Sequence, residues 1–258
     1  MMLVWRTIAD WQERRRALAG RTIGFVPTMG ALHQGHASLV ERCRRENEIA
    51  VVSIFVNPSQ FNDPSDLGRY PRTLDQDLSL LESLGTDEVL APGASEMYPD
   101  GYRFRVEPGD LDRVLEDVYR PGHLAGVLTI VLKLFGLVGA DRAYFGEKDY
   151  QQLRIVSDMA REFFLATQIV ACPTMREESG LAMSSRNMLL PPECRDRASQ
   201  LYRVLTTSTG SAEAKQELEA QGFTVEYVEE RWGRRLAAAY LNGVRLIDNV
   251  PVTDIRVV

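Results

Sequence analysis

Two short apolar runs flank a helical pattern near the start of the chain, and this arrangement constrains the fold more than any other feature. The runs, at 22–27 (TIGFVP) and 49–56 (IAVVSIFV), are rich in β-branched residues, which is typical of buried strands. Between them, residues 36–47 place apolar side chains on one helical face and Arg and Glu on the other. A strand, a glycine-containing turn, a helix and a second strand form a βαβ unit, which predicts a parallel sheet.

The same alternation continues along the chain. The further expected elements are a helix at 74–84, a strand at 88–92, a helix at 122–139, a strand at 142–145, a helix at 149–164 and a strand at 167–172. Strands that alternate with helices in this way predict an α/β fold with a doubly wound parallel sheet, Rossmann-like, over residues 1–175.

The pattern changes after residue 175. Residues 176–190 are polar and are predicted to form a linker loop. Beyond this loop the expected elements are helices near 193–208 and 211–221 and two strand-like runs at 223–229 and 235–241, the second of which continues through an Asn242-Gly243 turn signal into VRLIDNV. These elements predict a small α+β C-terminal lid domain over residues 176–258.

Composition and charge exclude several function classes. The 258 residues include 36 acidic and 30 basic side chains, and a net charge of −6 gives no general attraction to nucleic acid or to anionic membranes. The three cysteines show no C-x-x-C spacing, which argues against a disulfide framework or a cysteine zinc site. The first residues do not resemble a signal peptide, and the apolar stretch at 124–138 is too short to span a bilayer. We therefore expect a globular protein of the cytoplasm.

His33 and His36 bracket Gly35 in the segment MGALHQGH, directly after the first predicted strand. A helix that begins here presents free backbone N–H groups and the positive end of its dipole, which favours phosphate. Both imidazoles can donate to phosphate oxygens and stabilise the charge that develops during attack on an α-phosphate. The structural alternative is that these histidines cap a helix or lie on the surface. A metal pair is less favoured, because no third ligand stands at a recognisable spacing.

Two further clusters can bind phosphate. The segment GEKDYQQ at 146–152 follows a predicted strand, so its Lys148 would lie at the ligand-binding edge of the sheet, although an ordinary charged helix start is equally compatible. The segment GLAMSSRN at 180–187 contains two hydroxyls and Arg186, which can fork onto two phosphate oxygens, although alone it would be taken as a plain loop. Together with the histidines, these clusters predict that the protein handles ATP phosphates.

The order of the motifs resembles that of the class I nucleotidyl-transfer superfamily, in which HIGH-type and KMSKS-type motifs flank the ATP phosphates. Within it, the chain resembles the pantothenate synthetase (pantoate–β-alanine ligase) family. The segments that carry this resemblance are VPTMGALHQGH, VVSIFVNPSQF, YPRTLDQDL, RPGHLAGVLTIVLKLF, FGEKDYQQL and GLAMSSRN, with RLIDN as a weaker match.

The resemblance implies a reaction in two steps. ATP and pantoate first give pantoyl adenylate and pyrophosphate, and the amine of β-alanine then displaces AMP to form pantothenate, which serves coenzyme A biosynthesis. It also implies Mg²⁺ as a partner of the pyrophosphate, a homodimer, and no nucleic-acid or membrane partner. The second domain of the family usually exceeds a hundred residues, so this chain, with about seventy residues after Asn187, is expected to carry a shortened one.

The resemblance further implies roles for individual residues. The catalytic residues would be His33, His36, as proton donor, and Lys148. Gln60 and Gln152 would bind pantoate, Gln60 would also border the β-alanine site, and Asp77 would be the metal ligand, although Gln76 stands where relatives often carry an acid. The ATP-binding residues would be Met29, Gly30, Ala31, Leu32, His33, Gln34, Gly35, His36, Gly146, Glu147, Lys148, Asp149, Met175, Met183, Ser184, Ser185 and Arg186.

Some alternatives remain open from the sequence. A nucleotidyltransferase of the nicotinate-mononucleotide type would share the HxGH turn, and a non-enzymatic nucleotide sensor could keep the fold. Arg120 and His123 in the RPGH segment could either shape the pocket or form a structural turn before the helix at 122–139.

Overall fold

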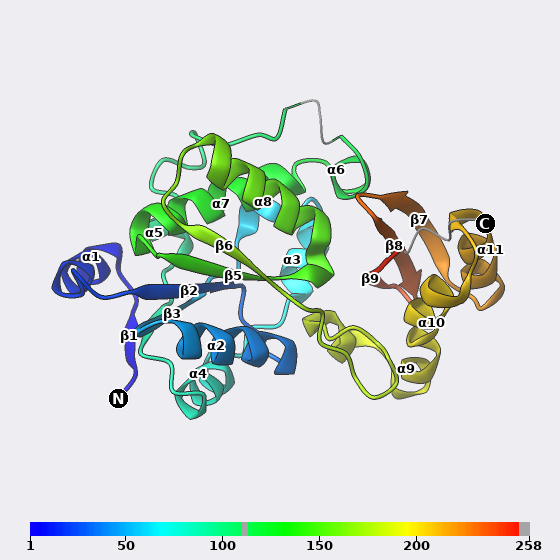
Figure 1. Cartoon of the computed structure of the whole chain (residues 1–258), viewed down its shortest axis with the longest axis horizontal. Helices are drawn as coiled ribbons and strands as arrows, with labels where there is room; N and C mark the ends of the chain where they lie inside the picture. The colour runs from blue at the N-terminus through cyan, green and yellow to red at the C-terminus, as the bar shows by residue number, and fades with distance from the viewer. Residues whose placement is uncertain (110–112, 253–258) are drawn as a thin grey trace, which may run out of the picture. The chain divides into compact units, whose positions relative to one another are not determined.

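The structure is a computed structural model that describes residues 1–109 and 113–252. The chain divides into two compact units (Figure 1). The first comprises Met1–Glu147 and Gln151–Cys172, and the second comprises Lys148–Tyr150 and Pro173–Val258. Residues 253–258, the end of the predicted C-terminal domain, lie outside the described residues.

A six-stranded parallel sheet forms the centre of the first unit, which confirms the predicted fold class. In spatial order its strands are β1 (Leu3–Trp5), β4 (Glu88–Leu90), β3 (Ile49–Ile54), β2 (Ile23–Thr28), β5 (Arg142–Gly146) and β6 (Gln168–Cys172). Five of these strands fall in predicted runs. The sequence did not identify β1, which has only three residues and pairs with β4 at the sheet edge.

Helices cover both faces of this sheet (Figure 1). Those named in the sequence prediction are α2 (Gln34–Glu46), α4 (Leu74–Ser83), α7 (His123–Val138) and α8 (Tyr150–Glu162). The others are α1 (Ile8–Ala17), α3 (Pro64–Arg69), α5 (Ala94–Met97), α6 (Glu116–Tyr119) and the 3-10 turns η1 (Pro58–Gln60) and η3 (Glu147–Asp149). In the described part of the chain, no helix is both long enough and apolar enough to cross a membrane.

The strand order reverses between β2 and β5, and the ladder between these two strands is short. The carbonyl of Ile23 accepts from the N–H of Asp141 at 2.8 Å, so Ile23 directs its backbone groups at β5. Alternate residues of a strand face the same neighbour, and Pro27 therefore also faces β5, where it has no N–H to donate. The pairing with β5 ends at Phe25, whereas the pairing with β3 continues to Thr28. Ligands of this fold bind in the crevice that forms at such a reversal.

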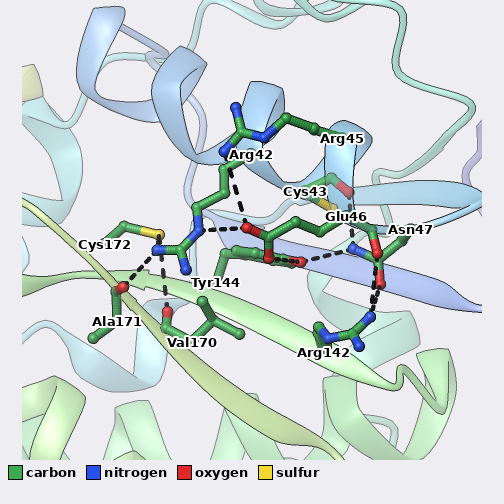
Figure 2. A network of polar contacts seen from close by, with 10 residues as sticks. All are labelled: Arg42, Cys43, Arg45, Glu46, Asn47, Arg142, Tyr144, Val170, Ala171 and Cys172. Atoms are coloured by element: carbon green, nitrogen blue, oxygen red, sulfur yellow. Dashed lines mark hydrogen bonds and ion pairs between the residues drawn. The ribbon is translucent and has the colours of Figure 1, made fainter.

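A polar network holds the C-terminal end of α2 against the sheet (Figure 2). Arg42 donates to the carbonyl of Ala171 in β6 at 2.8 Å and to Glu46 at 2.9 Å. The hydroxyl of Tyr144 in β5 donates to Glu46 at 3.0 Å and accepts from Asn47 at 2.7 Å. Burial raises the pKa of Tyr144 to about 12, and the hydrogen bond from Arg42 lowers the pKa of Glu46. The helix that begins at the HQGH segment is thus fixed at its far end.

The second unit contains a three-stranded antiparallel sheet with strands β7 (Thr224–Arg231), β8 (Arg234–Leu241) and β9 (Val244–Pro251). Asn242 and Gly243 form the predicted turn before β9, with φ angles of 49° and 76°. The helices are α9 (Pro192–Ala198), α10 (Gln200–Thr207) and α11 (Ser211–Ala220), preceded by the 3-10 turn η4 (Ser185–Leu189). The single helix predicted at 193–208 is therefore wrong in its continuity, because the chain divides at Ser199.

Candidate active site

His33 and His36 cap the first turn of α2 through a reciprocal pair of hydrogen bonds. The N–H of Gly35 donates to Nδ1 of His33 at 3.1 Å, and the N–H of His33 donates to Nδ1 of His36 at 3.4 Å. The two ring centroids lie 4.1 Å apart. The capping role was the structural alternative for these histidines, and the structure shows that both of them fulfil it.

These hydrogen bonds also set the tautomer of each ring. Because Nδ1 of His33 and Nδ1 of His36 both accept an N–H, the neutral imidazoles carry their proton on Nε2. Both side chains are partly exposed at the N-terminus of α2, where the helix dipole favours an anion. Capping therefore does not compete with phosphate binding, since it uses Nδ1 of each ring and not the nitrogen that carries the proton.

The loop before these histidines has an unusual backbone conformation. Gly30 and Ala31 both adopt left-handed conformations, with φ of 77° and 49°. The carboxylate of Asp77 in α4 accepts from the N–H of Ala31 at 3.0 Å and from the N–H of Leu32 at 2.8 Å. The hydroxyl of Thr73 donates to the same carboxylate at 3.2 Å. Asp77 is only 3% exposed, so it is a buried group bonded to the loop.

A cavity of about 330 Å³ opens at the carboxyl ends of β2, β3 and β4. Its lining includes three predicted site residues, Met29, Gly30 and Asp77. The other lining residues are Ile54, Phe55, Val56, Pro58, Pro71, Arg72, Thr73, Leu74, Ala91, Pro92 and Ala94. A cavity at this edge of a parallel sheet lies where α/β proteins bind their ligands.

Gln60, the predicted pantoate ligand, is buried in the η1 turn after β3. Its Oε1 accepts from Nδ2 of Asn57 at 3.0 Å, and Asn57 also donates to the carbonyl of Gly126 at 3.2 Å. The first turns of α7 pack so closely here that a Cβ on Gly126 would lie 2.4 Å from the carbonyl oxygen of Ser59. Asn57 belongs to the quoted NPSQF segment, but sequence reasoning gave it no role, because only the fold brings α7 beside this turn.

His123 and Arg120 hold the same turn through its backbone. The guanidinium of Arg120 lies 3.1 Å from Nε2 of His123, and Nδ1 of His123 lies 2.7 Å from the carbonyl oxygen of Gln60. Arginine can only donate, so Nε2 accepts and the proton on Nδ1 is donated to Gln60. Both side chains are buried. Both residues are thus connected to the backbone of the η1 turn, and their role in the reaction stays a prediction.

Lys148 and Asp149 lie in η3, and the contacts of Lys148–Tyr150 place this segment in the second unit. Nδ2 of Asn249 in β9 donates to the carbonyl of Lys148 at 2.9 Å, and its Oδ1 accepts from Arg234 at 2.7 Å. The guanidinium of Arg234 lies 4.4 Å from the centroid of the Tyr150 ring. The backbone of Lys148 is thus fixed by a strand about a hundred residues away.

The segment from Met175 to Arg186 is more regular than the predicted loop. Arg176 and Ala182 form an antiparallel bridge, and the N–H of Met183 donates to the carbonyl of Met175 at 3.0 Å. The side chain of Ser184 then caps η4 by accepting from the N–H of Arg186 at 3.2 Å. The predicted linker loop thus contains one backbone bridge across a tight turn, which composition does not reveal.

An ion pair anchors this segment. Arg176 donates to both carboxylate oxygens of Asp248, at 2.6 and 2.9 Å, and its guanidinium lies 3.7 Å from the centroid of the Tyr202 ring. Asp248 is only 3% exposed. Burial raises the pKa of Asp248, and the charge of Arg176 opposes that rise. Neither residue was singled out from the sequence, although Asp248 lies in the RLIDN match.

The predicted site residues are divided between the two units. His33, His36, Gln60, Asp77 and Gln152 belong to the first unit, together with the remainder of Met29–His36 and with Gly146 and Glu147. Lys148, Asp149, Met175 and Met183–Arg186 belong to the second. Gln152 is partly buried near the start of α8, and its neighbour Gln151 is fully buried, where it binds the backbone of Val114 and Glu116.

Comparison with known proteins places these motifs in a wider context. The family model for pantoate-beta-alanine ligase matches residues 3–251. The pantothenate synthetase of Bdellovibrio bacteriovorus is 49% identical, over 98% of this chain and 100% of its own length. The pantothenate synthetase of Legionella pneumophila (strain Corby) is 48% identical, over 96% of this chain and 99% of its own length.

Solved structures are similar to this chain over nearly its whole length. The pantoate-beta-alanine ligase of Francisella tularensis, complexed with beta-gamma ATP and beta-alanine, has a TM-score of 0.94 at 40% identity and covers 97% of this chain and 98% of its own. The pantothenate synthetase of Thermus thermophilus has a TM-score of 0.89 at 43% identity, covering 97% and 99%. Since these relatives are matched almost completely, the expectation of a shortened second domain is not met in comparison with them.

Proposed function

The chain belongs to the pantoate–β-alanine ligase family, and from this premise we propose how its own residues carry out the reaction. It is an ATP-dependent ligase that joins pantoate to β-alanine and forms pantothenate. The observation that carries the proposal is the cap of α2, which puts the ring proton of both His33 and His36 on Nε2, at the helix end that favours an anion.

In the first step the carboxylate of pantoate attacks the α-phosphorus of ATP. A bond forms between the carboxylate oxygen and phosphorus, and the bond to the oxygen that bridges to the β-phosphate breaks, so pyrophosphate leaves. His33 and His36 donate hydrogen bonds from Nε2–H to the phosphate oxygens as charge develops there, and the donor role of His36 is this hydrogen bond, with the proton staying on its ring. Lys148 places its ammonium on the leaving phosphates, where it offsets their charge.

ATP is bound by backbone and side-chain groups of several motifs. The family resemblance of the matching segments supports this assignment. The proposed residues are Met29, Gly30, Ala31, Leu32, His33, Gln34, Gly35, His36, Gly146, Glu147, Lys148, Asp149, Met175, Met183, Ser184, Ser185 and Arg186. Arg186 adds a planar guanidinium that can bind two phosphate oxygens.

Gln60 and Gln152 bind pantoate, and Gln60 also borders the β-alanine site. Because Oε1 of Gln60 accepts from Asn57, the amide N–H₂ of Gln60 is oriented as a donor toward an acid or a hydroxyl. In the second step the neutral amine of β-alanine attacks the acyl carbon of the adenylate. The carbon–nitrogen bond forms, the bond from the acyl carbon to the phosphate oxygen breaks, AMP leaves, and the nitrogen loses a proton.

Magnesium is a separate question. Among residues 1–109 and 113–252, no group of three His, Cys, Asp or Glu side chains could hold a metal ion. Both oxygens of Asp77 already accept hydrogen bonds, and its neighbours Asp75 and Gln76 are not buried. Asp77, the predicted ligand, is therefore bonded to the loop and to Thr73. Magnesium in ATP enzymes is commonly bound by the substrate phosphates themselves, and we expect Mg²⁺ to arrive with ATP.

We also propose a homodimer in the cytoplasm with no nucleic-acid or membrane partner. The net charge of −6 supports the last point, because it gives no general attraction to polyanions. Sedimentation velocity of the purified protein would test the dimer, and a single species at the monomer mass of 29.1 kDa would contradict it.

Pantoate-dependent exchange of labelled pyrophosphate into ATP tests the proposed division of work. We expect exchange with pantoate and none with nicotinate mononucleotide, and exchange with the latter alone would support a nucleotidyltransferase instead. His36→Ala and Lys148→Ala should each lower the exchange rate by about a hundredfold or more while the protein stays folded. Lys215→Ala is the matched control, because Lys215 is an exposed lysine on α11. Unchanged rates in the His36 or Lys148 variants would overturn these roles.

A further inference from the structure

We propose that Asp77 is a positioning residue that holds the HQGH loop in its left-handed conformation and so sets the orientation of His33 and His36. This inference rests on the proposed function, because it takes the two histidines as the phosphate donors. It replaces the predicted metal-ligand role of Asp77 with a mechanical one.

The loop needs an external constraint because of its backbone. Ala31 has a φ of 49°, a conformation that residues with a Cβ adopt rarely and keep only where their surroundings enforce it. Gly30, directly before it, has a φ of 77°. Two consecutive residues in this region reverse the chain between the end of β2 and the first turn of α2. Without hydrogen bonds that stabilise this conformation, we expect Ala31 to change to a more favourable φ and to move His33.

Asp77 stabilises this conformation by accepting hydrogen bonds from two consecutive peptide N–H groups. Its Oδ2 accepts from Ala31 at 3.0 Å and its Oδ1 accepts from Leu32 at 2.8 Å. One carboxylate oxygen for each N–H fixes both the position and the tilt of the loop. The approach is so close that a Cβ on Gly30 would lie 2.9 Å from Oδ2 of Asp77, so this carboxylate and a glycine at position 30 require each other.

The hydrogen bonds from the loop to Asp77 also determine the position of the two histidines. Leu32 precedes His33, whose own N–H donates to Nδ1 of His36. The N–H groups of Ala31, Leu32 and His33 are therefore each fixed by a side chain, the first two by Asp77 and the third by His36. A rotation of the peptide plane of Leu32 would therefore turn His33 and displace the Nε2 donors of both His33 and His36.

Asp77 is anchored well enough to act in this way. It lies in the first turn of α4, its own N–H donates to the carbonyl of Thr73 at 2.9 Å, and the Thr73 hydroxyl donates to its Oδ1 at 3.2 Å. Its exposure is 3%. By contrast, Asp75 on the same helix is not buried, which makes it a matched control.

A double-mutant cycle tests the proposal. Asp77→Asn turns one acceptor oxygen into a donor that faces a backbone N–H, and we expect the kcat of pantoate-dependent exchange to fall about a hundredfold, with a much smaller change in the KM for pantoate. Ala31→Gly removes the penalty of the left-handed conformation. Asp77→Asn should therefore cost about tenfold less in the Ala31→Gly background than in the wild type. Asp75→Asn should leave the rate unchanged.

The opposing outcome is equally specific. If Asp77 is a metal ligand, the loss in Asp77→Asn will be the same in both backgrounds and will be recovered by raising Mg²⁺ or by substituting Mn²⁺, and this result would overturn the proposal. Failure of the proposed function itself is distinguishable, because the wild-type protein would then show no exchange with pantoate at all.

A spectroscopic readout separates positioning from a general loss of structure. The chain has three histidines, so a ¹⁵N-histidine spectrum reports His33, His36 and His123. Asp77→Asn should shift the ring signals of the first two and leave those of His123 in place; shifts in all three, or in none, would contradict the proposal. Should Asp77→Asn not fold, Thr73→Ala removes only one donor to Asp77. We then expect a loss of about threefold that Ala31→Gly reduces, and an unchanged rate would overturn the idea.

Discussion

The HQGH loop of the first unit and the Lys148 segment of the second are both held through their backbones by polar side chains from distant parts of the chain, but with opposite chemistry. The loop offers N–H groups, and the carboxylate of Asp77 accepts them. The Lys148 segment offers a carbonyl, and the amide of Asn249 donates to it. The two segments leave different backbone groups outside regular structure, N–H groups in the loop and a carbonyl in the Lys148 segment. Each group needs a partner of the opposite kind, which explains why an acceptor, Asp77, serves one and a donor, Asn249, serves the other.

The buried aspartates Asp77 and Asp248 are stabilised in different ways. Asp77 is surrounded by N–H and O–H donors, whereas Asp248 is paired with a full positive charge on Arg176 and accepts one backbone hydrogen bond, from the N–H of Asn249 at 2.7 Å. A charge balanced by many dipoles loses little when one donor is removed. A buried charge that depends mainly on a bidentate ion pair loses most of its stabilisation when the cation is removed. Asp248 should therefore be more sensitive than Asp77 to the loss of a single partner.

The largest expected effect is that of Arg176→Met. Removing the guanidinium leaves Asp248 buried without its cation, which should lower the free energy of unfolding by about 3–5 kcal/mol. Urea unfolding followed by circular dichroism measures this loss, with Arg203→Met, outside this ion pair, as the control. A loss below about 1 kcal/mol, which is typical of surface ion pairs, would show that Asp248 does not depend on its cation and would remove the contrast with Asp77.

The same variant should show a distinctive pH dependence. Burial raises the pKa of Asp248, and the substitution removes a cation that lowers it, so the folded variant has the more strongly raised pKa. A raised folded-state pKa gives stability that is present below the ordinary pKa of aspartate and is lost as pH rises through the folded value. The deficit of Arg176→Met relative to wild type should therefore shrink on acidification from neutral pH toward about pH 4. A deficit that grows over this range would contradict the assignment.

Gly126→Ala should disturb the close packing of α7 against the η1 turn that positions Gln60 in the first unit. The added Cβ would lie 2.4 Å from the carbonyl oxygen of Ser59, so η1 must shift away from α7. We expect a loss of about 1–3 kcal/mol in stability and a rise in the KM for pantoate of about tenfold. Gly136→Ala lies on the same helix with no atom within 4 Å of the new Cβ, and it should be neutral or stabilising. Equal effects from both variants would show that helix propensity, not the close approach, decides the outcome.

Asn249→Leu tests the hydrogen bond between the Asn249 amide and the Lys148 carbonyl in the second unit. It removes the donor to the Lys148 carbonyl and the acceptor for Arg234, which should cost about 1–2 kcal/mol and lower the kcat of pyrophosphate exchange about tenfold. The KM for pantoate should change little, because Gln60 and Gln152 belong to the other unit. Steady-state kinetics over a pantoate series distinguishes the two parameters, and a change confined to KM would refute the link to Lys148.

The smallest effect is expected for Tyr144→Phe in the network of Figure 2. The hydroxyl donates to Glu46, which keeps its bond to Arg42, so the loss should be about 0.5–1.5 kcal/mol without a change in exchange rate. Because burial raises the pKa of Tyr144 to about 12, the hydroxyl stays neutral and the difference should be constant from about pH 6 to 9. A loss of activity in this variant would mean that the far end of α2 controls the histidines at its start.

Periodicity predicted the long elements well, because β2, β3, α2 and α7 each bury one face or both in the sheet. It missed α3, α5 and α6, which have only four to six residues and too few apolar positions to show a period, and the longer α1, in which Trp11 is the one buried residue. The break at Ser199 was also missed, since the apolar pattern continues through it.

Motifs indicated the candidate ligand-binding residues, but not the residues that bond to their backbones. His33 and His36 stand together in the sequence, and their spacing at a helix start was informative. Asp77 lies 46 residues from Ala31, and Asn249 lies 101 residues from Lys148. Contacts at such separations leave no periodic or local signal, so only the folded chain identifies these partners.

Pro27 gives the sheet a property that no side chain supplies. Lacking an N–H toward β5, it ends the ladder at Phe25, although β5 itself continues to Gly146. The carboxyl ends of the two strands are thus not joined by this ladder in the folded protein. A ligand that binds at this strand reversal would not have to break backbone hydrogen bonds between Pro27 and β5, so that cost would not reduce its affinity.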